Sequence, residues 1–366
     1  MIATQGNQGA LSRSKYVELR ALGRSDLKIS ALAFGTATFG GTSPIARLLA
    51  GLGLAEATRL VDMCCDAGVN LFDTADIYSD GEAERLLGLA LRHRRNQVLI
   101  SSKAFGRTGP GVDDVGSSRA HLLRACEASL KRLGTDRIDL YQLHGFDALT
   151  PLEETVRALD ELVRAGKVRH VGCSNFAAWQ LMKALGIAER TGSVRWVSQQ
   201  IYYSMVGRDA EHELIPAALD QQLGTLVWGP LASGLLSGKV KRGEGFPADT
   251  RIGAGVPGSA ELFDPNTAFD VLDTAGDIAA ARGVPVCQVA LNWLLGRPGV
   301  TTVLIGARNE RQLRENLEAS RWRLSSEEVE RLDACGSPRL PYPLWHQRSV
   351  YQSERNPLPD KVPRSS

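Results

Sequence analysis

The sequence predicts an α/β protein built on a closed (β/α)8 barrel of the TIM type, with an N-terminal hairpin, a long loop after the seventh strand and an extended C-terminal tail. Short apolar runs alternate with helical patterns eight times along the chain, which is typical of a parallel sheet covered by helices. The runs are almost continuously apolar, as expected for strands buried on both faces. The length of 366 residues suits one such barrel domain.

Eight strand segments are expected along the chain, after a hairpin whose turn is Gly23–Asp26. The second segment ends abruptly in an acid, and a phenol follows five residues later. A Gly/Pro-rich stretch at residues 239–265 is too long for a plain connection, so we expect a functional loop there. The expected strands lie at residues 31–36, within 70–78, and at 98–103, 138–144, 168–174, 197–202, 225–228 and 301–305.

The rest of the chain falls outside the barrel pattern. We expect residues 1–15 to be a flexible leader, residues 16–335 a single domain, and residues 336–366 an extension packed on the barrel. The tail contains Tyr342, Trp345 and His346, and the sequence leaves open whether these aromatics line the barrel mouth.

The charge and the cysteine content limit which binding partners and which cellular compartment are expected. A formal net charge of +2 gives no electrostatic reason to expect a nucleic acid or an anionic membrane as partner. No apolar run approaches the roughly 20 residues that span a bilayer, and the N-terminus has no apolar stretch of the signal-peptide type. The six cysteines show no Cys-x-x-Cys spacing. We therefore expect free thiols in a reducing, cytoplasmic environment.

Polar side chains stand at the carboxyl ends of the expected strands. These ends meet at one mouth of a barrel, which is where barrel proteins place their chemistry. Taken singly, Asp73 could cap a helix, Lys103 could be solvated, His144 could be structural and Tyr78 could be a surface aromatic. Their occurrence at neighbouring strand ends favours a common site. The residues at the eight ends are Thr36, Asp73, Lys103, His144, Ser174, Gln200, Trp228 and Gly306.

An acid, an amine, an imidazole and a phenol together suit proton donation to an oxygen that is becoming an alkoxide. The phenol of Tyr78 would be the donor, and the ammonium of Lys103 would stabilise the phenolate that remains. Asp73 would keep Lys103 charged, and His144 would orient the substrate oxygen. This chemistry needs no metal site and no nucleophilic serine or cysteine. It does need a hydride donor, which implies a cofactor.

The tetrad Asp73, Tyr78, Lys103 and His144, in this order on successive barrel segments, resembles the catalytic tetrad of the aldo-keto reductase superfamily. The resemblance extends from about residue 16 to residue 335, and one departure is Asp26, which stands where glycine is usual. It implies NADPH-dependent, reversible reduction of an aldehyde or ketone to the alcohol. Further segments that resemble the family are residues 24–30, 72–78, 133–140, 172–176, 229–239 and 305–308.

The resemblance also implies that a nicotinamide dinucleotide is bound without a Rossmann fold. Ser174, Asn175 and Gln200 would hold the carboxamide, and Trp228 would stack on the nicotinamide ring. Ser174-Asn175 could instead cap a helix, and Trp228 could instead belong to the core. The remaining expected cofactor contacts are Gly35, Thr36, Asp73, Gly229, Pro230, Leu231, Ser233, Gly234, Lys239, Ile305, Gly306, Ala307, Arg308, Gln312 and Asn316.

Only a few residues indicate which cofactor and which substrate are bound. Arg308 and Gln312, at the start of the last barrel helix, suit the 2′-phosphate of NADPH over NADH. Phe39 and Phe105, with Tyr78 and His144, are expected to contact a small-molecule carbonyl or alcohol substrate with an apolar or aromatic part. The sequence leaves the oligomeric state open.

Two other functions remain as alternatives. A Schiff-base aldolase would also place a lysine such as Lys103 at a barrel strand end. It would be trapped by borohydride with its substrate and would need no nicotinamide. A non-catalytic, cofactor-binding regulatory subunit on the same fold is the other alternative. Slow or absent turnover despite tight NADPH binding would favour it.

Overall fold

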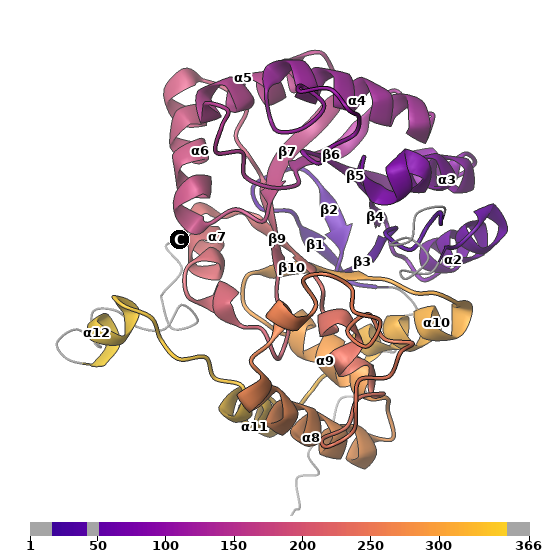
Figure 1. Ribbon diagram of the computed structural model, residues 1–366, viewed down its shortest axis with the longest axis vertical. Helices are drawn as coiled ribbons and strands as arrows, with labels where there is room; N and C mark the ends of the chain where they lie inside the picture. The colour runs from indigo at the N-terminus through magenta and orange to yellow at the C-terminus, as the bar shows by residue number, and fades with distance from the viewer. Residues whose placement is uncertain (1–16, 42–50, 350–366) are drawn as a thin grey trace, which may run out of the picture.

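The fold is a closed barrel of eight parallel strands surrounded by helices (Figure 1). The computed structural model describes residues 17–41 and 51–349, so the expected leader and the end of the tail, including Tyr351, lie outside the described residues. Around the barrel the strands follow the order β10-β3-β4-β5-β6-β7-β8-β9. Each neighbouring pair is parallel. The predicted fold class is therefore confirmed.

The barrel strands are short and buried, as the continuous apolar runs predict. Their bounds fall within one residue of the expected segments at almost every end, because each run is bounded by glycine or polar residues. The strands are β3 Leu32–Gly35, β4 Leu71–Asp73, β5 Leu99–Ala104, β6 Ile138–Leu143, β7 Val168–Ser174, β8 Ser198–Tyr202, β9 Gly224–Trp228 and β10 Val300–Ile305.

Helices between the strands bury one apolar face on the barrel. Local signals set their ends: the Ser118 hydroxyl caps α4 by accepting from the His121 amide, and Gly134 ends α4 in the left-handed conformation at φ 61°. The helices are α2 Leu54–Asp66, α3 Glu82–Leu91, α4 Arg119–Leu133, α5 Leu152–Arg164, α6 Ala178–Thr191, α7 Leu214–Gln221, α8 Pro265–Arg282, α9 Val286–Leu295, α10 Glu310–Glu318, α11 Ser326–Cys335 and α12 Leu344–Ser349.

The predicted hairpin closes the amino-terminal end of the barrel. It consists of β1 Leu19–Ala21 and β2 Lys28–Ser30. Three of its apolar side chains, Leu22, Leu27 and Ile29, form one buried cluster with residues of the barrel interior. The amino-terminal opening is thereby filled, so a small-molecule site inside the barrel has to open at the opposite, carboxyl end.

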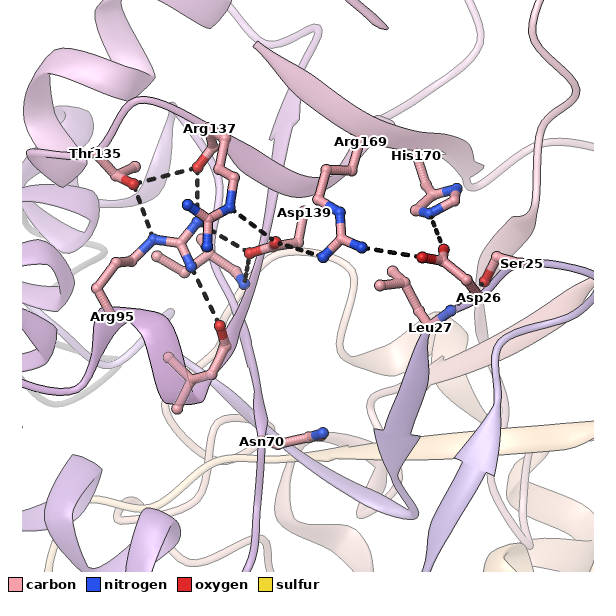
Figure 2. A network of polar contacts seen from close by, with 12 residues as sticks. Ser25, Asp26, Leu27, Asn70, Arg95, Thr135, Arg137, Asp139, Arg169 and His170 are labelled. Atoms are coloured by element: carbon pink, nitrogen blue, oxygen red, sulfur yellow. Dashed lines mark hydrogen bonds and ion pairs between the residues drawn. The ribbon is translucent and has the colours of Figure 1, made fainter. Parts of the chain in front are cut away.

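Figure 2 shows why an acid is suited to the hairpin turn. The carboxylate of Asp26 accepts hydrogen bonds from Arg169 at 3.1 Å and from His170 at 2.7 Å, both on β7. Arg169 also reaches the buried carboxylate of Asp139, 3.5 Å away, which Arg95 contacts at 3.0 Å. Asp26, which departs from the pattern of the resemblance, therefore connects the hairpin turn to β7.

The tail leaves α11 and ends, in the described part, at the short helix α12, which stands away from the barrel in Figure 1. Ser337, Pro338 and Leu340 line a cavity of about 510 Å³ together with residues of α7. Tyr342 is 75% exposed and Trp345 is 46% exposed. No tail residue in the described part lines the cavity at the barrel mouth, which answers the question that the sequence left open for these aromatics.

Among the described residues, no single helix is both long and apolar enough to cross a bilayer. Helices α8 and α9 meet that test only as a pair, and they are bent by 102° relative to each other. All six cysteines are free thiols, as predicted.

Candidate active site

A cavity of about 620 Å³ opens at the carboxyl end of the barrel. It runs from the ends of β4 and β6, across β8 and β9, to the start of α10, and most of the residues expected at the site line it. These are Gly35, Asp73, Tyr78, His144, Ser174, Asn175, Gln200, Trp228, Gly229, Pro230, Leu231, Ser233, Gly234, Lys239, Ile305, Gly306, Ala307, Arg308, Gln312 and Asn316.

A buried ion pair lies beneath the cavity. The Nζ of Lys103, on β5, donates to Oδ2 of Asp73 at 2.5 Å and to the backbone carbonyl of Thr74 at 2.8 Å. Gln200 donates to the other carboxylate oxygen, Oδ1, at 3.0 Å. Lys103 is 0% exposed and Asp73 is 2% exposed. Both carboxylate oxygens are thus occupied, and the ammonium is held in one position.

The pair keeps the lysine charged. Burial alone would lower the pKa of Lys103, but the carboxylate of Asp73 and the phenol of Tyr78 raise it above its ordinary value. The ammonium lies 5.2 Å from the centre of the Tyr78 ring. A fixed positive charge therefore stands next to the phenol that would have to lose a proton.

Tyr78 begins a short 3₁₀ turn, Tyr78–Gly81, in the connection between β4 and α3. Ser79 and Asp80 in this turn have φ values of 50° and 57°, a strained conformation for residues with side chains. The Ser79 hydroxyl holds the turn by donating to the Phe39 carbonyl at 2.7 Å. Burial raises the pKa of Tyr78, and the charge of Lys103 opposes that rise. The phenol is therefore protonated at neutral pH and ready to donate.

His144 follows β6 and faces Tyr78, with 5.6 Å between the ring centres and 75° between the planes. Burial and the charge of Lys103 lower the pKa of His144 to about 3. The imidazole is therefore neutral at physiological pH. Its Nδ1 has no hydrogen-bond partner among the described residues. A neutral imidazole has one N–H with which to orient a substrate oxygen.

Asn175 connects the tetrad to the next part of the cavity. Its amide donates to the His144 carbonyl at 2.9 Å and accepts from the Trp228 indole at 2.9 Å. It adopts a left-handed φ of 58°. The alternative that Ser174-Asn175 caps a helix does not hold, because the N-cap of α6 is Ala177. The buried Ser174 hydroxyl has no partner within the described residues, so it is free for a ligand.

Trp228 lies at the end of β9 and is only partly buried. One part packs on the cluster that fills the barrel interior, and the ring also lines the cavity. Its contact with Tyr202, 5.1 Å between ring centres, supports the ring from the side. The indole is thus held by packing on one side and faces the cavity on the other, which suits stacking on a planar ligand.

The far end of the cavity carries more cations than carboxylates. Arg251, from the long loop after β9, has no ion-pair partner among the described residues, and burial and the charge of Arg308 lower its pKa. Arg308 donates to the Asp249 carbonyl at 3.0 Å, and its amide donates to Gln312 at 2.9 Å. Partly buried cations that repel each other, as Arg251 and Arg308 do, are stabilised by a bound anion. The cations that line this end are Lys239, Arg251, Arg308 and Arg311, of which Lys239 pairs with Asp249 and Arg311 pairs with Glu315 at 3.0 Å.

These features fit an elongated, anionic, planar-headed ligand. The vacant Ser174 hydroxyl and the Trp228 ring suit an amide-bearing aromatic head. Gly229 and Gly234 have φ values of 66° and 95°, and they let the protein backbone run close to the cavity between Trp228 and the cationic end. The cations at the far end suit phosphates. The donor set therefore fits a nicotinamide dinucleotide.

Comparison with known proteins gives the family. The family model described as the aldo/keto reductase family matches residues 31–337. The chain belongs to this family.

Named relatives fall into more than one functional group. A probable voltage-gated potassium channel subunit beta of Arabidopsis thaliana is 37% identical over 83% of this chain and 91% of the relative. An uncharacterized oxidoreductase of Bacillus subtilis is 36% identical over the same shares. Versiconal hemiacetal acetate reductase of Aspergillus parasiticus is 30% identical over 89% of this chain and 99% of the relative.

Four expected residues of this aldo/keto reductase do not line the cavity. Lys103 lies beneath it, as part of the ion pair. Thr36 is buried and donates to the Asp73 carbonyl at 3.2 Å. Phe39 is 0% exposed and packs on Phe34, with 5.8 Å between ring centres. Phe105 is partly buried on the loop after β5 and packs against Gly145. Neither phenylalanine lines the cavity, and their contact with a substrate stays a prediction.

Sequence reasoning also missed several lining residues of this family member. Arg251, Asp249 and Thr250 come from the long loop that was expected to be functional, but the loop has no periodicity that identifies inward-facing residues. Arg311 and Glu315 lie on α10, on the same face as Gln312 and Asn316. The helical spacing of that face was a signal that could have found them.

Proposed function

We propose that this aldo/keto reductase reduces an aldehyde or ketone to the alcohol with NADPH, and that Tyr78 supplies the proton. The observation that carries the proposal is the placement of Tyr78 and His144 at the edge of the cavity, above the buried Lys103–Asp73 pair. This placement supports proton donation from Tyr78 to a substrate oxygen held beside His144, next to a cavity that fits a dinucleotide.

Each side chain of the tetrad has a distinct part in the proposed reaction. A reduced nicotinamide supplies the hydride when it is bound. The neutral His144 orients the carbonyl oxygen through one hydrogen bond. Tyr78 transfers its proton to that oxygen as negative charge develops, and the Lys103 ammonium stabilises the phenolate left behind. Asp73 keeps the ammonium charged and fixed. The same groups act in the reverse order for alcohol oxidation.

The cavity residues would hold the cofactor along its length. Ser174, Asn175 and Gln200 would bind the carboxamide, with Trp228 stacked on the ring. The glycine-containing segment from Gly229 to Lys239 would follow the pyrophosphate. Gly306, Arg308, Gln312 and Asn316 would hold the adenosine end, and Arg251 adds a cation for the phosphates.

The proposal is tested by offering the enzyme a panel of aldehydes and ketones with NADPH and following absorbance at the nicotinamide wavelength. We expect carbonyl-dependent oxidation of NADPH for at least some members of the panel. Oxidation that is independent of any carbonyl, or none at all, would contradict the proposal.

The arrangement around Arg308 further predicts a preference for NADPH over NADH. We expect Arg308→Ala to weaken NADPH binding by about 10- to 100-fold, as for loss of a hydrogen bond to a charged group, and to change NADH binding little. Dissociation constants for both cofactors measure this. Arg321→Ala, at an exposed arginine outside the cavity, serves as the control. Preference of the wild-type enzyme for NADH would refute the prediction.

A second candidate function is a cofactor-binding regulatory subunit. The names of several relatives, as probable potassium channel beta subunits, favour it. Tight NADPH binding without turnover of any carbonyl would support it over reduction. The Schiff-base aldolase is disfavoured, because Lys103 is fully buried, paired with Asp73 and absent from the cavity lining.

A further inference from the structure

A carboxyl group without a hydrogen-bond partner lies buried two residues before Tyr78. Asp76 is 2% exposed, and neither of its side-chain oxygens has a partner among the described residues. The proposed reaction does not use this group. A carboxylate buried without a partner is strongly destabilised by the loss of hydration, whereas the neutral acid is destabilised much less. The burial of Asp76 therefore favours the protonated form.

The backbone around Asp76 forms the turn that presents Tyr78. The amide of Asp76 donates to the Lys103 carbonyl at 3.1 Å, which fixes the chain after β4 against β5. The amide of Tyr78 donates back to the Ala75 carbonyl at 3.2 Å, so Asp76 and Ile77 are the two central residues of the turn. A movement of Asp76 toward water would therefore displace the phenol as well.

A negative charge that acts on Asp76 is already fixed in the core. The carboxylate of Glu84, on α3, is 0% exposed and accepts from Arg132 of α4 at 2.7 Å and from the Ser102 hydroxyl of β5. An ionised Asp76 would add a second buried negative charge to the one that Arg132 neutralises. Burial and the charge of Glu84 raise the pKa of Asp76 to about 7, although Arg132 and Lys103 oppose the rise.

Two further titratable groups belong to the same buried region, and neither ionises near neutral pH. The hydroxyl of Tyr141, on β6, has no partner in the described part of the chain. Burial, Cys126 of α4, Asp76 and Glu84 raise the pKa of Tyr141 well above its ordinary value. Burial raises the pKa of Cys126 to about 12. A neutral Asp76 has both a donor and an acceptor to offer to such neighbours, whereas an ionised one can only accept.

We propose that Asp76 is a positioning residue that holds the Tyr78 turn in place only as the neutral acid, so that loss of its proton stops carbonyl reduction. When the proton leaves, two buried carboxylates share one arginine, and the new charge is stabilised only by hydration. Water reaches Asp76 by displacing the turn, and Tyr78 then moves away from His144. The proposal rests on the proposed carbonyl reduction, because its effect on turnover requires Tyr78 as the proton donor.

The pH dependence of turnover tests the proposal. At saturating NADPH and aldehyde, we expect the wild-type kcat to fall about tenfold for each pH unit above about pH 8, as the neutral fraction of Asp76 does. The fall cannot come from His144, whose pKa is about 3, or from Tyr78 and Lys103, whose pKa values are raised above 10.0 and 10.5. Asp76→Asn, which resembles the neutral acid, should show no fall up to about pH 9. Asp80→Asn, at an exposed carboxyl of the same connection, is the matched control and should keep the wild-type pH dependence. The wild-type fall in Asp76→Asn would overturn the proposal.

Unfolding measurements separate this proposal from the proposed reduction, because they need no turnover. The folded protein binds the proton of Asp76 more tightly than the unfolded chain does, so its contribution to stability is lost as the pH rises from about 4 to about 7. The ratio of the unfolding constants of wild type and Asp76→Asn should rise about tenfold for each pH unit in this range and stay constant above about pH 8. A ratio independent of pH would overturn the proposal. If the ratio changes as expected but no carbonyl is reduced, the buried neutral acid stands and the proposed reduction fails.

Infrared spectroscopy gives the same test if Asp76→Asn does not fold. The wild-type protein is labelled with carbon-13 at the aspartate carboxyls, which identifies the carbonyl band of a neutral aspartic acid by its isotope shift. We expect this band at pH 6 and its loss by about pH 9. Absence of the band at pH 6 would show that Asp76 is ionised there and would overturn the proposal.

Discussion

Replacing Tyr78 by phenylalanine is expected to lower kcat for carbonyl reduction by about 10²- to 10⁴-fold, the range for loss of a general acid. The change removes one oxygen atom and leaves the ring next to His144 and Lys103. The phenol lies at the edge of the cavity, so the dissociation constant for NADPH should stay within about twofold of the wild-type value. A tenfold change in this constant would correspond to about 1.4 kcal/mol of binding free energy. Steady-state kinetics and a fluorescence titration with NADPH measure the two quantities.

A matched control distinguishes the loss of the proton donor from a general effect of removing a phenol oxygen. Tyr342→Phe alters a tyrosine that is 75% exposed on the tail, and it should leave both quantities unchanged. Turnover by Tyr78→Phe near the wild-type rate would show that another group donates the proton. Loss of NADPH binding in this variant would show that Tyr78 has a structural role in the cavity.

Replacing Lys103 by methionine is expected to affect activity and stability together. The phenolate would lose its neighbouring cation, so kcat should fall by about 10²-fold or more. The Asp73 carboxylate would be left buried without its cation, and removal of one partner of a buried pair costs about 3–5 kcal/mol of unfolding free energy. Guanidinium chloride unfolding of the two proteins measures the second effect.

A double variant separates the two consequences. Asp73→Asn combined with Lys103→Met removes the unpaired charge and should recover part of the lost stability, while activity stays low. A single Lys103→Met variant as stable as the wild-type protein would mean that the pair contributes nothing to folding. Recovery of activity in the double variant would contradict the role given to the ammonium.

The strands and the group of polar side chains at their carboxyl ends could be predicted because both depend on local pattern. Each strand is an apolar run that ends at a polar residue, as at Asp73 and His144, and parallel strands bring such ends together in any closed barrel. The direction of a loop side chain has no comparable rule. Phe39 packs inward on Phe34 rather than facing the cavity, because the turn after β3 points it into the core.

Contacts between distant parts of the chain were also beyond sequence reasoning. Arg251 reaches the cavity from a long loop without periodicity, so no pattern identified it. The interaction of Asp26 with Arg169 and His170 joins residues more than 140 positions apart, and it explains an acid where glycine is usual. Lys103 was expected at the mouth, but its short bonds to Asp73 and the Thr74 carbonyl draw the ammonium beneath it.

Transfer of a labelled hydride tests the central claim most directly. The wild-type enzyme is given NADPH deuterated at the transferable position together with an aldehyde that the panel shows to be consumed, and the alcohol is analysed by mass spectrometry and NMR. The account predicts one deuterium on the carbinol carbon of each product molecule. An alcohol without the label, or binding of NADPH with no alcohol formed from any carbonyl, would contradict it.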